Sequence, residues 1–279
     1  MLTDKFYALF LFLFVLTAAS CYSPRYMYSP AASNVPILTK KGDSKLAAYY
    51  SNSSFGGRDV KNLYSYGFDV QAAYAINNHW LVLLSQSNRY EKTSGDLETY
   101  YLDSNSIRYK RSMTEIGGGY FTAIRDSSKL YVQITGGIGF GKFTLDDNGK
   151  DATAGYYSRH HQTGVTKFFI QPALQLRYNK HFSSSFASRF IVLWYHSVKT
   201  NYTAAEQDVY LLDVLTVSPR TFWEPAIINN FSFNKLPALQ FELQFGFAAL
   251  ISRRFVDYRA VNISAGATLN MAGFKKRGK

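Results

Sequence analysis

The feature that most restricts the fold of this chain is a period of two residues in its hydrophobic pattern. In residues 64–76 every even position is apolar or aromatic, whereas the odd positions are Ser, Gly, Asp, Gln or Ala. Adjacent residues of a β-strand point to opposite faces of the sheet, so this segment predicts a strand with one apolar and one polar face. The same alternation recurs in residues 239–247 and 261–270.

Ten segments with strand character follow one another along the chain. They are residues 44–53, 63–76, 79–90, 106–124, 129–145, 165–178, 182–198, 221–233, 237–250 and 257–271. The predicted strand content of the chain therefore exceeds the roughly 20–25% that is usual in a soluble domain. Most of the segments exceed the roughly 9–11 residues that a tilted strand needs to cross a bilayer. A soluble barrel with its apolar face inside is the alternative.

The connections between these segments alternate between short and long. Short turns on one side and long loops on the other are typical of outer-membrane barrels, whose short turns are periplasmic. We therefore predict an all-β fold: a single antiparallel up-and-down transmembrane β-barrel of about ten strands, with short periplasmic turns and long extracellular loops. The 47% apolar and 17% aromatic residues exclude a disordered chain, and the single cysteine excludes a disulfide scaffold.

Turn lengths predict the pairing of several strands. A turn at residues 179–181 pairs Phe168 with Val192, and a turn at 234–236 pairs Phe231 with Leu239. After Ile76, a three-residue turn places Trp80 and its alternate neighbours on the lipid side. A two-residue turn would place Leu81 and Leu83 there instead. We favour the three-residue turn, because Trp80 would then lie in the periplasmic aromatic girdle.

The N-terminus has the pattern of an export signal. Lys5 precedes an apolar run over residues 6–16, and small residues then lead to Cys21. Such a segment predicts a signal peptide over residues 1–20. Ala18-Ala19-Ser20-Cys21 resembles the bacterial lipobox, which predicts that Cys21 is acylated; a free thiol is the alternative. The remaining divisions are a lipid-anchored periplasmic tether (21–43), the barrel (44–271) and a basic periplasmic tail (272–279).

Several stretches are similar to a group of outer-membrane lipoprotein barrels from the Bacteroidota. They are Asn34-Val-Pro-Ile-Leu-Thr-Lys-Lys-Gly-Asp43, Ala47-Ala-Tyr-Tyr50, Glu115-Ile-Gly-Gly-Gly-Tyr-Phe121 and Phe222-Trp-Glu-Pro225. The resemblance implies the fold and the location in the outer membrane. It implies no particular biochemical activity.

The polar face of the strands predicts a polar lumen. Its candidate network comprises Asp69, Glu115, Gln171, Arg177, Arg189, Glu224 and Glu242. Buried charges are costly unless they are paired, and ten strands enclose little more space than side chains can fill. We therefore expect a polar plug, with a narrow solute channel as the alternative. In this register Gly117 faces Gly137, and both point inward to make room for a neighbouring side chain.

No motif in the sequence predicts catalysis, a cofactor or a metal. Gly136–Gly141 lies inside a strand and lacks the following helix of a phosphate loop. His160 and His161 are adjacent and have no acidic or Cys partner at a fixed spacing. An outer-membrane protease shares the number of strands but none of its motifs appears. We expect a non-enzymatic structural or accessory subunit, with a channel and a rim-active hydrolase as alternatives.

The net charge of +12 indicates an anionic partner. Export excludes nucleic acid as a natural partner. Many of the cations fall near the predicted outer ends of the strands, among them Arg89, Lys167 and Arg259. Those proposed to form a rim that binds anionic outer-membrane lipid are Arg108, Lys110, Arg253 and Arg254. Other outer-membrane proteins are the second class of expected partner.

Overall fold

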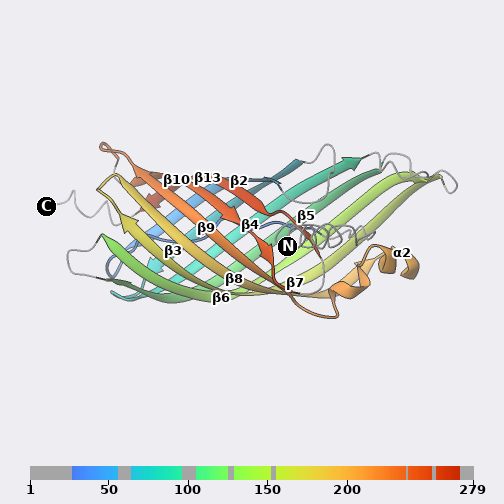
Figure 1. Cartoon of the computed structure of the whole chain (residues 1–279), viewed down its shortest axis with the longest axis horizontal. Helices are drawn as coiled ribbons and strands as arrows, with labels where there is room; N and C mark the ends of the chain where they lie inside the picture. Colours follow the sequence, from blue (N-terminus) through green and yellow to red (C-terminus); the bar gives the residue numbers. More distant parts are fainter. Residues whose placement is uncertain are drawn as a thin grey trace, which may run out of the picture.

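Ten long antiparallel strands close into one barrel (Figure 1). The computed structural model describes residues 27–55, 64–95, 105–124, 129–151, 155–236, 238–252 and 256–270. The barrel strands are β2 (Ser44–Phe55), β3 (Tyr64–Ala75), β4 (Trp80–Gly95), β5 (Asn105–Ala123), β6 (Leu130–Asp151), β7 (Gly155–Arg177), β8 (Phe182–Thr200), β9 (Arg220–Ser232), β10 (Leu239–Phe247) and β13 (Val261–Asn270). Each pairs with its neighbours in sequence, and pairing of β13 with β2 closes the ring. The ten-stranded barrel predicted from the alternation is confirmed.

The two ends of the barrel differ in their connections. At the turn end, short connections join β3 to β4, β5 to β6, β7 to β8 and β9 to β10. The opposite end, the loop end, carries α2 (Ala204–Val209), the 3₁₀ helix η1 (Asp213–Leu215) and the short strands β11 (Ala249–Leu250) and β12 (Asp257–Tyr258). Within the described ranges, no helix combines the length and the apolar character needed to cross a membrane.

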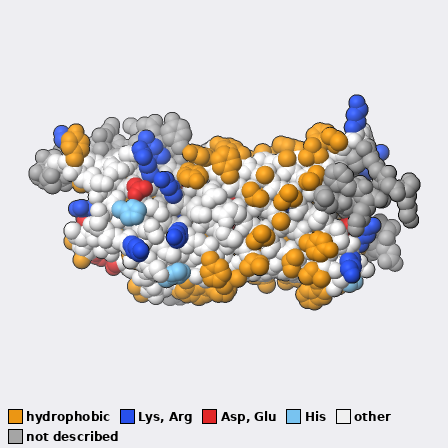
Figure 2. All heavy atoms as spheres, turned by 180° about the vertical axis from the view of Figure 1, so that it is seen from behind, with side chains coloured by type: hydrophobic (Ala, Val, Ile, Leu, Met, Phe, Trp, Pro, Cys, Tyr) orange, Lys and Arg blue, Asp and Glu red, His pale blue; other side chains and the backbone are white. Residues whose placement is uncertain are grey.

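The outer face of the barrel is apolar in the half nearest the turn end. Phe68, Leu84 and Ile170 are each about half exposed, while the alternate residues Asp69 and Leu83 are buried. Figure 2 shows hydrophobic side chains over this half and a paler, more polar surface towards the loop end. β6 and β7 have 22 and 23 residues and so exceed the roughly 9–11 needed to cross a bilayer. This architecture is that of an outer-membrane barrel.

Two of the three register predictions are confirmed. Phe168 pairs with Val192. Trp80 is 55% exposed on the outer face, whereas Leu81 is 2% exposed. The third prediction is wrong by two residues, because Phe231 pairs with Phe241 and not with Leu239. An additional turn, closed by a hydrogen bond from the Leu239 amide to the Leu236 carbonyl (3.0 Å), lengthens that connection. A shift of two residues keeps every side chain on its predicted face.

The N-terminal part of the described chain lies inside the barrel. Residues 28–38, here called the lumenal segment, are buried throughout except for the half-buried Ala31. The prediction of a periplasmic tether is therefore wrong for these residues. Their polar backbone is hydrogen-bonded to the wall, which removes the cost of burying an extended chain without a sheet partner.

Candidate functional site

The lumenal segment runs from the loop end of the barrel to the turn end. At the loop end, β1 (Met27–Tyr28) pairs in parallel with β12. At the turn end, the Gly42 amide donates a hydrogen bond to the carbonyl of Ala75, the last residue of β3 (2.9 Å). The chain then enters β2 at Ser44 and crosses the membrane in the opposite direction. The lumen is thus occupied along its length by the chain's own N-terminal residues.

Inward side chains take the place of a neighbouring strand for the backbone of the lumenal segment. The Ser33 amide donates to Gln244 Oε1 (2.8 Å), and Gln244 Nε2 donates to the Ser33 carbonyl (3.0 Å). The Ala32 amide donates to Asp69 Oδ2 (3.1 Å), and its carbonyl accepts from Gln71 Nε2 (2.8 Å). These paired bonds are the reason why the inward face carries amides and not only ion pairs.

Asn34 forms hydrogen bonds with three strands of the wall, β3, β4 and β7. Its side-chain Nδ2 donates to the Ala72 carbonyl and to Ser85 Oγ, both at 3.2 Å. Its carbonyl accepts from Gln171 Nε2 at 3.0 Å. The side-chain amide of Gln171, which the sequence placed in the lumenal network, therefore binds the lumenal segment.

Alanines on the wall make room for the apolar side chains of the lumenal segment. Val35 clusters with Ala173, Ala187 and Ala226 of three adjacent strands. Leu38 lies near the turn end in a cluster with Ala73, Ala75, Leu81, Leu83 and Phe121. Larger inward side chains at these positions would occupy the space that the segment fills.

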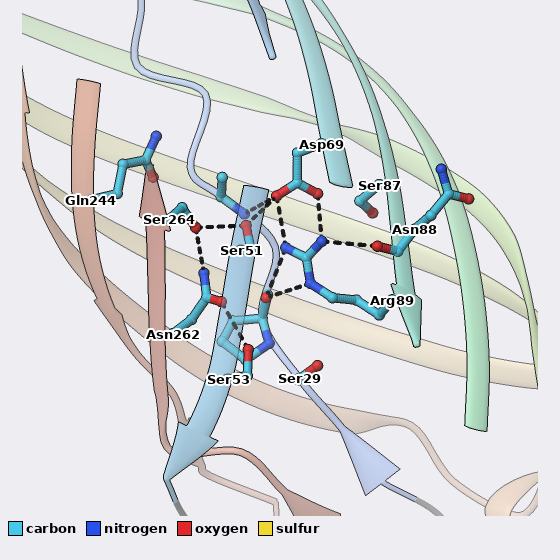
Figure 3. Close-up of polar contacts among 12 residues, drawn as sticks. Ser29, Ser51, Ser53, Asp69, Ser87, Asn88, Arg89, Gln244, Asn262 and Ser264 are labelled. Atoms are coloured by element: carbon cyan, nitrogen blue, oxygen red, sulfur yellow. Dashed lines mark hydrogen bonds and ion pairs between the residues drawn. The ribbon is translucent and has the colours of Figure 1, made fainter. Parts of the chain in front are cut away.

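Asp69 and Arg89 form a paired bridge beside the segment. Arg89 donates from Nη1 to Oδ1 (2.8 Å) and from Nη2 to Oδ2 (2.7 Å) of Asp69. Its guanidinium also donates to the carbonyl of Pro30 (3.2 and 3.3 Å), and Ser51 Oγ donates to Asp69 (2.9 Å). Figure 3 shows Ser51 and Arg89 on either side of the carboxylate. The pair is buried, and each partner is satisfied by further hydrogen bonds.

Glu115 holds two cations at once. Its carboxylate pairs with Lys167 Nζ (2.8 Å) and with the Arg189 guanidinium, and all three side chains are buried. The guanidinium of Arg189 lies over the Phe169 ring, 4.3 Å from its centroid. A Cβ on Gly137 would meet the backbone of Ile116 and Gly117 first and would also lie 2.8 Å from that ring. The inward glycine therefore makes room for the backbone of β5 as well as for the neighbouring Phe169 side chain.

Two further buried carboxylates, Glu242 and Glu224, accept hydrogen bonds from tyrosines. Glu242 accepts from Tyr49 Oη (2.7 Å) and pairs with Lys45 Nζ (3.2 Å). Glu224 accepts a hydrogen bond from Tyr28 Oη of the lumenal segment (2.5 Å).

The structure brings six of the seven predicted lumenal residues to the lumenal segment or to the buried ion pairs of the wall around it. Arg177 stands apart near the turn end, where it is half-buried over the Tyr131 ring at 5.4 Å. Cys21, Arg253 and Arg254 lie outside the described residues. Arg108 and Lys110 are exposed on the outer face, as their phase predicted.

Three cations expected near the outer ends of strands are lumenal instead. Arg89, Lys167 and Arg259 are each at most 3% exposed, and each pairs with a carboxylate. Their sequence phase carried this information, because Arg89 shares the inward phase of Leu81 and Leu83. Glu91, which pairs with Arg259 and Arg111, was missed for the same reason.

Two cavities between the segment and the wall, lined by described residues, are small. One cavity of about 10 Å³ is lined by Asn34, Glu115, Gln171 and Arg189 among others, and a second of about 10 Å³ lies beside Asp69 and Gln71. A single water needs roughly this volume. These cavities therefore suit individual waters rather than a solute.

The histidine pair forms no metal centre. His160 Nδ1 lies 2.7 Å from Asp146 Oδ1 on the exposed surface, while His161 is buried. Within the described ranges, no group of three or more His, Cys, Asp or Glu side chains is placed to hold a metal ion.

No protein-family model matches the chain, and no curated protein matches it by sequence. Solved outer-membrane barrels resemble it in fold. The β domain of the Bordetella autotransporter BrkA is 9% identical, with 82% of this chain and 99% of that one covered and a TM-score of 0.48. The translocator domain of the autotransporter NalP from Neisseria meningitidis is 10% identical, with 82% and 88% covered and a TM-score of 0.44. The attachment invasion locus protein Ail of Yersinia pestis is 14% identical, with 82% and 99% covered and a TM-score of 0.33. The structural neighbours are thus outer-membrane β-barrels of Gram-negative bacteria.

Proposed function

We propose that this protein is a closed, non-conducting outer-membrane lipoprotein barrel that serves as a structural or accessory subunit of an outer-membrane assembly. The observation that carries the proposal is the lumenal segment, which is hydrogen-bonded to the wall between its two ends. A solute path would require this segment to leave. The buried ion pairs then serve to hold the segment and the wall in one arrangement.

Purification through a tag after Lys279, from the protein's own outer membrane, tests both parts of the proposal. In planar bilayers the purified protein should show no conductance steps, because the lumen holds chain where a channel holds water. Steady open steps would support the channel alternative instead. The same preparation should contain one further outer-membrane protein in a near-equal amount. Recovery of the barrel alone after mild solubilisation would contradict the accessory role.

The path of the lumenal segment bears on the lipid anchor. Met27 lies at the loop end, six positions after Cys21 in the sequence. Six extended residues reach at most about 20 Å. An acylated Cys21 would therefore lie within reach of the loop end and not of the turn end. We propose that Cys21 carries the anchor and inserts it into the outer leaflet, in place of the periplasmic anchor expected from the sequence.

Two measurements test this anchor. Labelling with palmitate should mark the wild type and be lost in Cys21→Ser, because the thiol is the acylated group. An epitope inserted after Tyr22 should bind antibody on intact cells. Antibody binding only after permeabilisation of the outer membrane would place this end in the periplasm and contradict the proposal.

A further inference from the structure

A groove of about 290 Å³ lies on the outer face of the barrel towards the loop end. Its lining residues come from β3, β4 and β5: Tyr66, Tyr90, Glu91, Lys92, Arg108, Tyr109 and Lys110. Its two outer tyrosines, Tyr66 and Tyr90, and its three cations are exposed on the outer face, so their role does not depend on whether the barrel conducts.

Strand register brings the tyrosines and cations of the groove together. Tyr66 pairs with Tyr90, and Tyr90 pairs with Lys110 on the next strand. One rung further towards the loop end, Lys92 pairs with Arg108. The two tyrosine rings are stacked, with centroids 5.6 Å apart and planes at 25°. All five side chains are exposed, so they face the surroundings of the barrel.

The groove lies at the border of the apolar band. On β3 the exposed apolar residues run from Tyr66 to Ile76, and a tilted strand climbs about 2.5 Å per residue, which gives a band of about 25 Å. This is the height expected of the lipid-facing band. The tyrosines and Lys110, their register partner, therefore lie at its upper edge, where aromatic girdles occur. Lys92 and Arg108 lie just above, level with the head groups.

Among the residues that the structure describes, no carboxylate pairs with the three cations of the groove. No ion pair joins Lys92, Arg108 or Lys110 to any residue that the structure describes. Asp146 is the register partner of Arg108, but its carboxylate contacts His160.

Glu91, the acidic residue that lines the groove, is also paired with other cations. Glu91 has the inward phase of β4 and pairs with Arg111 and Arg259. Three like charges on two adjacent rungs repel one another unless an anion joins them.

We propose that this groove binds the phosphate of a phosphorylated glycolipid of the outer leaflet. Arg108 offers paired donors to the phosphate oxygens, and Lys92 and Lys110 add point charges on either side. The stacked rings of Tyr66 and Tyr90 offer a flat surface to the sugar and the upper acyl chain. The structure thus adds Lys92 and the two tyrosines to the basic rim predicted from Arg108 and Lys110.

The test uses delipidated full-length protein in a neutral detergent, titrated with diphosphorylated lipid A and followed by native mass spectrometry. The triple variant Lys92→Gln, Arg108→Gln, Lys110→Gln should bind about tenfold or more weakly, because it loses several charge-assisted hydrogen bonds. The control triple variant Lys41→Gln, Lys129→Gln, Lys180→Gln removes the same charge from exposed positions at the turn end. It should bind like the wild type.

Lipid A without phosphates provides the second arm. It should bind the wild type as weakly as phosphorylated lipid binds the groove variant. Unchanged affinity of the groove variant, an equal loss in the control variant, or equal binding of dephosphorylated lipid would each overturn the proposal. Heat-modifiable gel mobility of both variants verifies that the barrel is folded before the titration.

Discussion

Glu115→Gln should lower the free energy of unfolding of the barrel by about 3–5 kcal/mol, the usual result of removing one partner from a buried ion pair. Glu115 is the carboxylate that pairs with both Lys167 and Arg189, and the three side chains are no more than 8% exposed. The amide keeps the shape of the side chain but removes its charge. Two buried cations would then share a site without this carboxylate.

Glu206→Gln is the matched control. Glu206 of α2 also pairs with an arginine, Arg159 of β7, at 2.9 Å, but both side chains are about 30% exposed. Exposed pairs contribute about 0–1 kcal/mol, so we expect little change. Urea unfolding of both variants in lipid vesicles, followed by tryptophan fluorescence, gives the comparison. Equal losses in the two variants would show that the Glu115 cluster is not a buried network.

The strands were predictable because a barrel wall separates two environments. Lipid lies on one side and the polar lumen on the other, so the period of two is imposed on every strand that crosses. Phe168 and Val192 could be paired from this alternation and the turn length alone. The β9–β10 register could not be predicted in this way, because a shift of two residues leaves every side chain on the same face and is compatible with the same alternation.

The lumenal segment was not predictable from periodicity. A chain inside a barrel is enclosed on all sides, so its residues need no alternation, and residues 28–38 read as a tether. The available signal lay on the wall. Inward alanines such as Ala173, Ala187 and Ala226 leave space that strand side chains alone would not fill. That space had to be occupied either by water or by chain.

The partners of the lumenal charges were partly predictable. The inward acids Asp69 and Glu115 were found by phase, and the same rule applied to Arg89 and Lys167 would have paired them. Their height along the strand alone predicts a position near the head groups. The position of a residue along the strand determines whether it is level with the head groups. Whether its side chain faces lipid or the lumen depends on its alternation along the strand, which must be considered first.

Amide hydrogen exchange of the wild type should show the lumenal segment as protected as the barrel strands. The amides of Ala32 and Ser33 donate to Asp69 and Gln244 inside the wall, and the segment is buried between Tyr28 and Leu38. A buried, hydrogen-bonded amide exchanges only when its surroundings open. We expect exchange at least about a hundredfold slower than that of an unstructured peptide, which corresponds to an opening free energy of about 3 kcal/mol.

A variant at Leu38 shows that the measurement reports on the segment. Leu38→Asp places a carboxylate among Leu81, Leu83 and Phe121, where an unpaired charge costs several kcal/mol. The amides of the segment should then exchange faster while those of the strands stay protected. Leu236→Asp, at a turn position that is 57% exposed, should leave both unchanged.

The exchange rate of peptides that cover residues 28–38 in the wild type, in lipid vesicles, tests the plugged lumen most directly. Slow exchange that matches the strands, together with its loss in Leu38→Asp, is the result that a segment seated in the barrel predicts. Complete exchange of these peptides within seconds, while the strands remain protected, would place the segment outside the lumen and contradict the closed barrel.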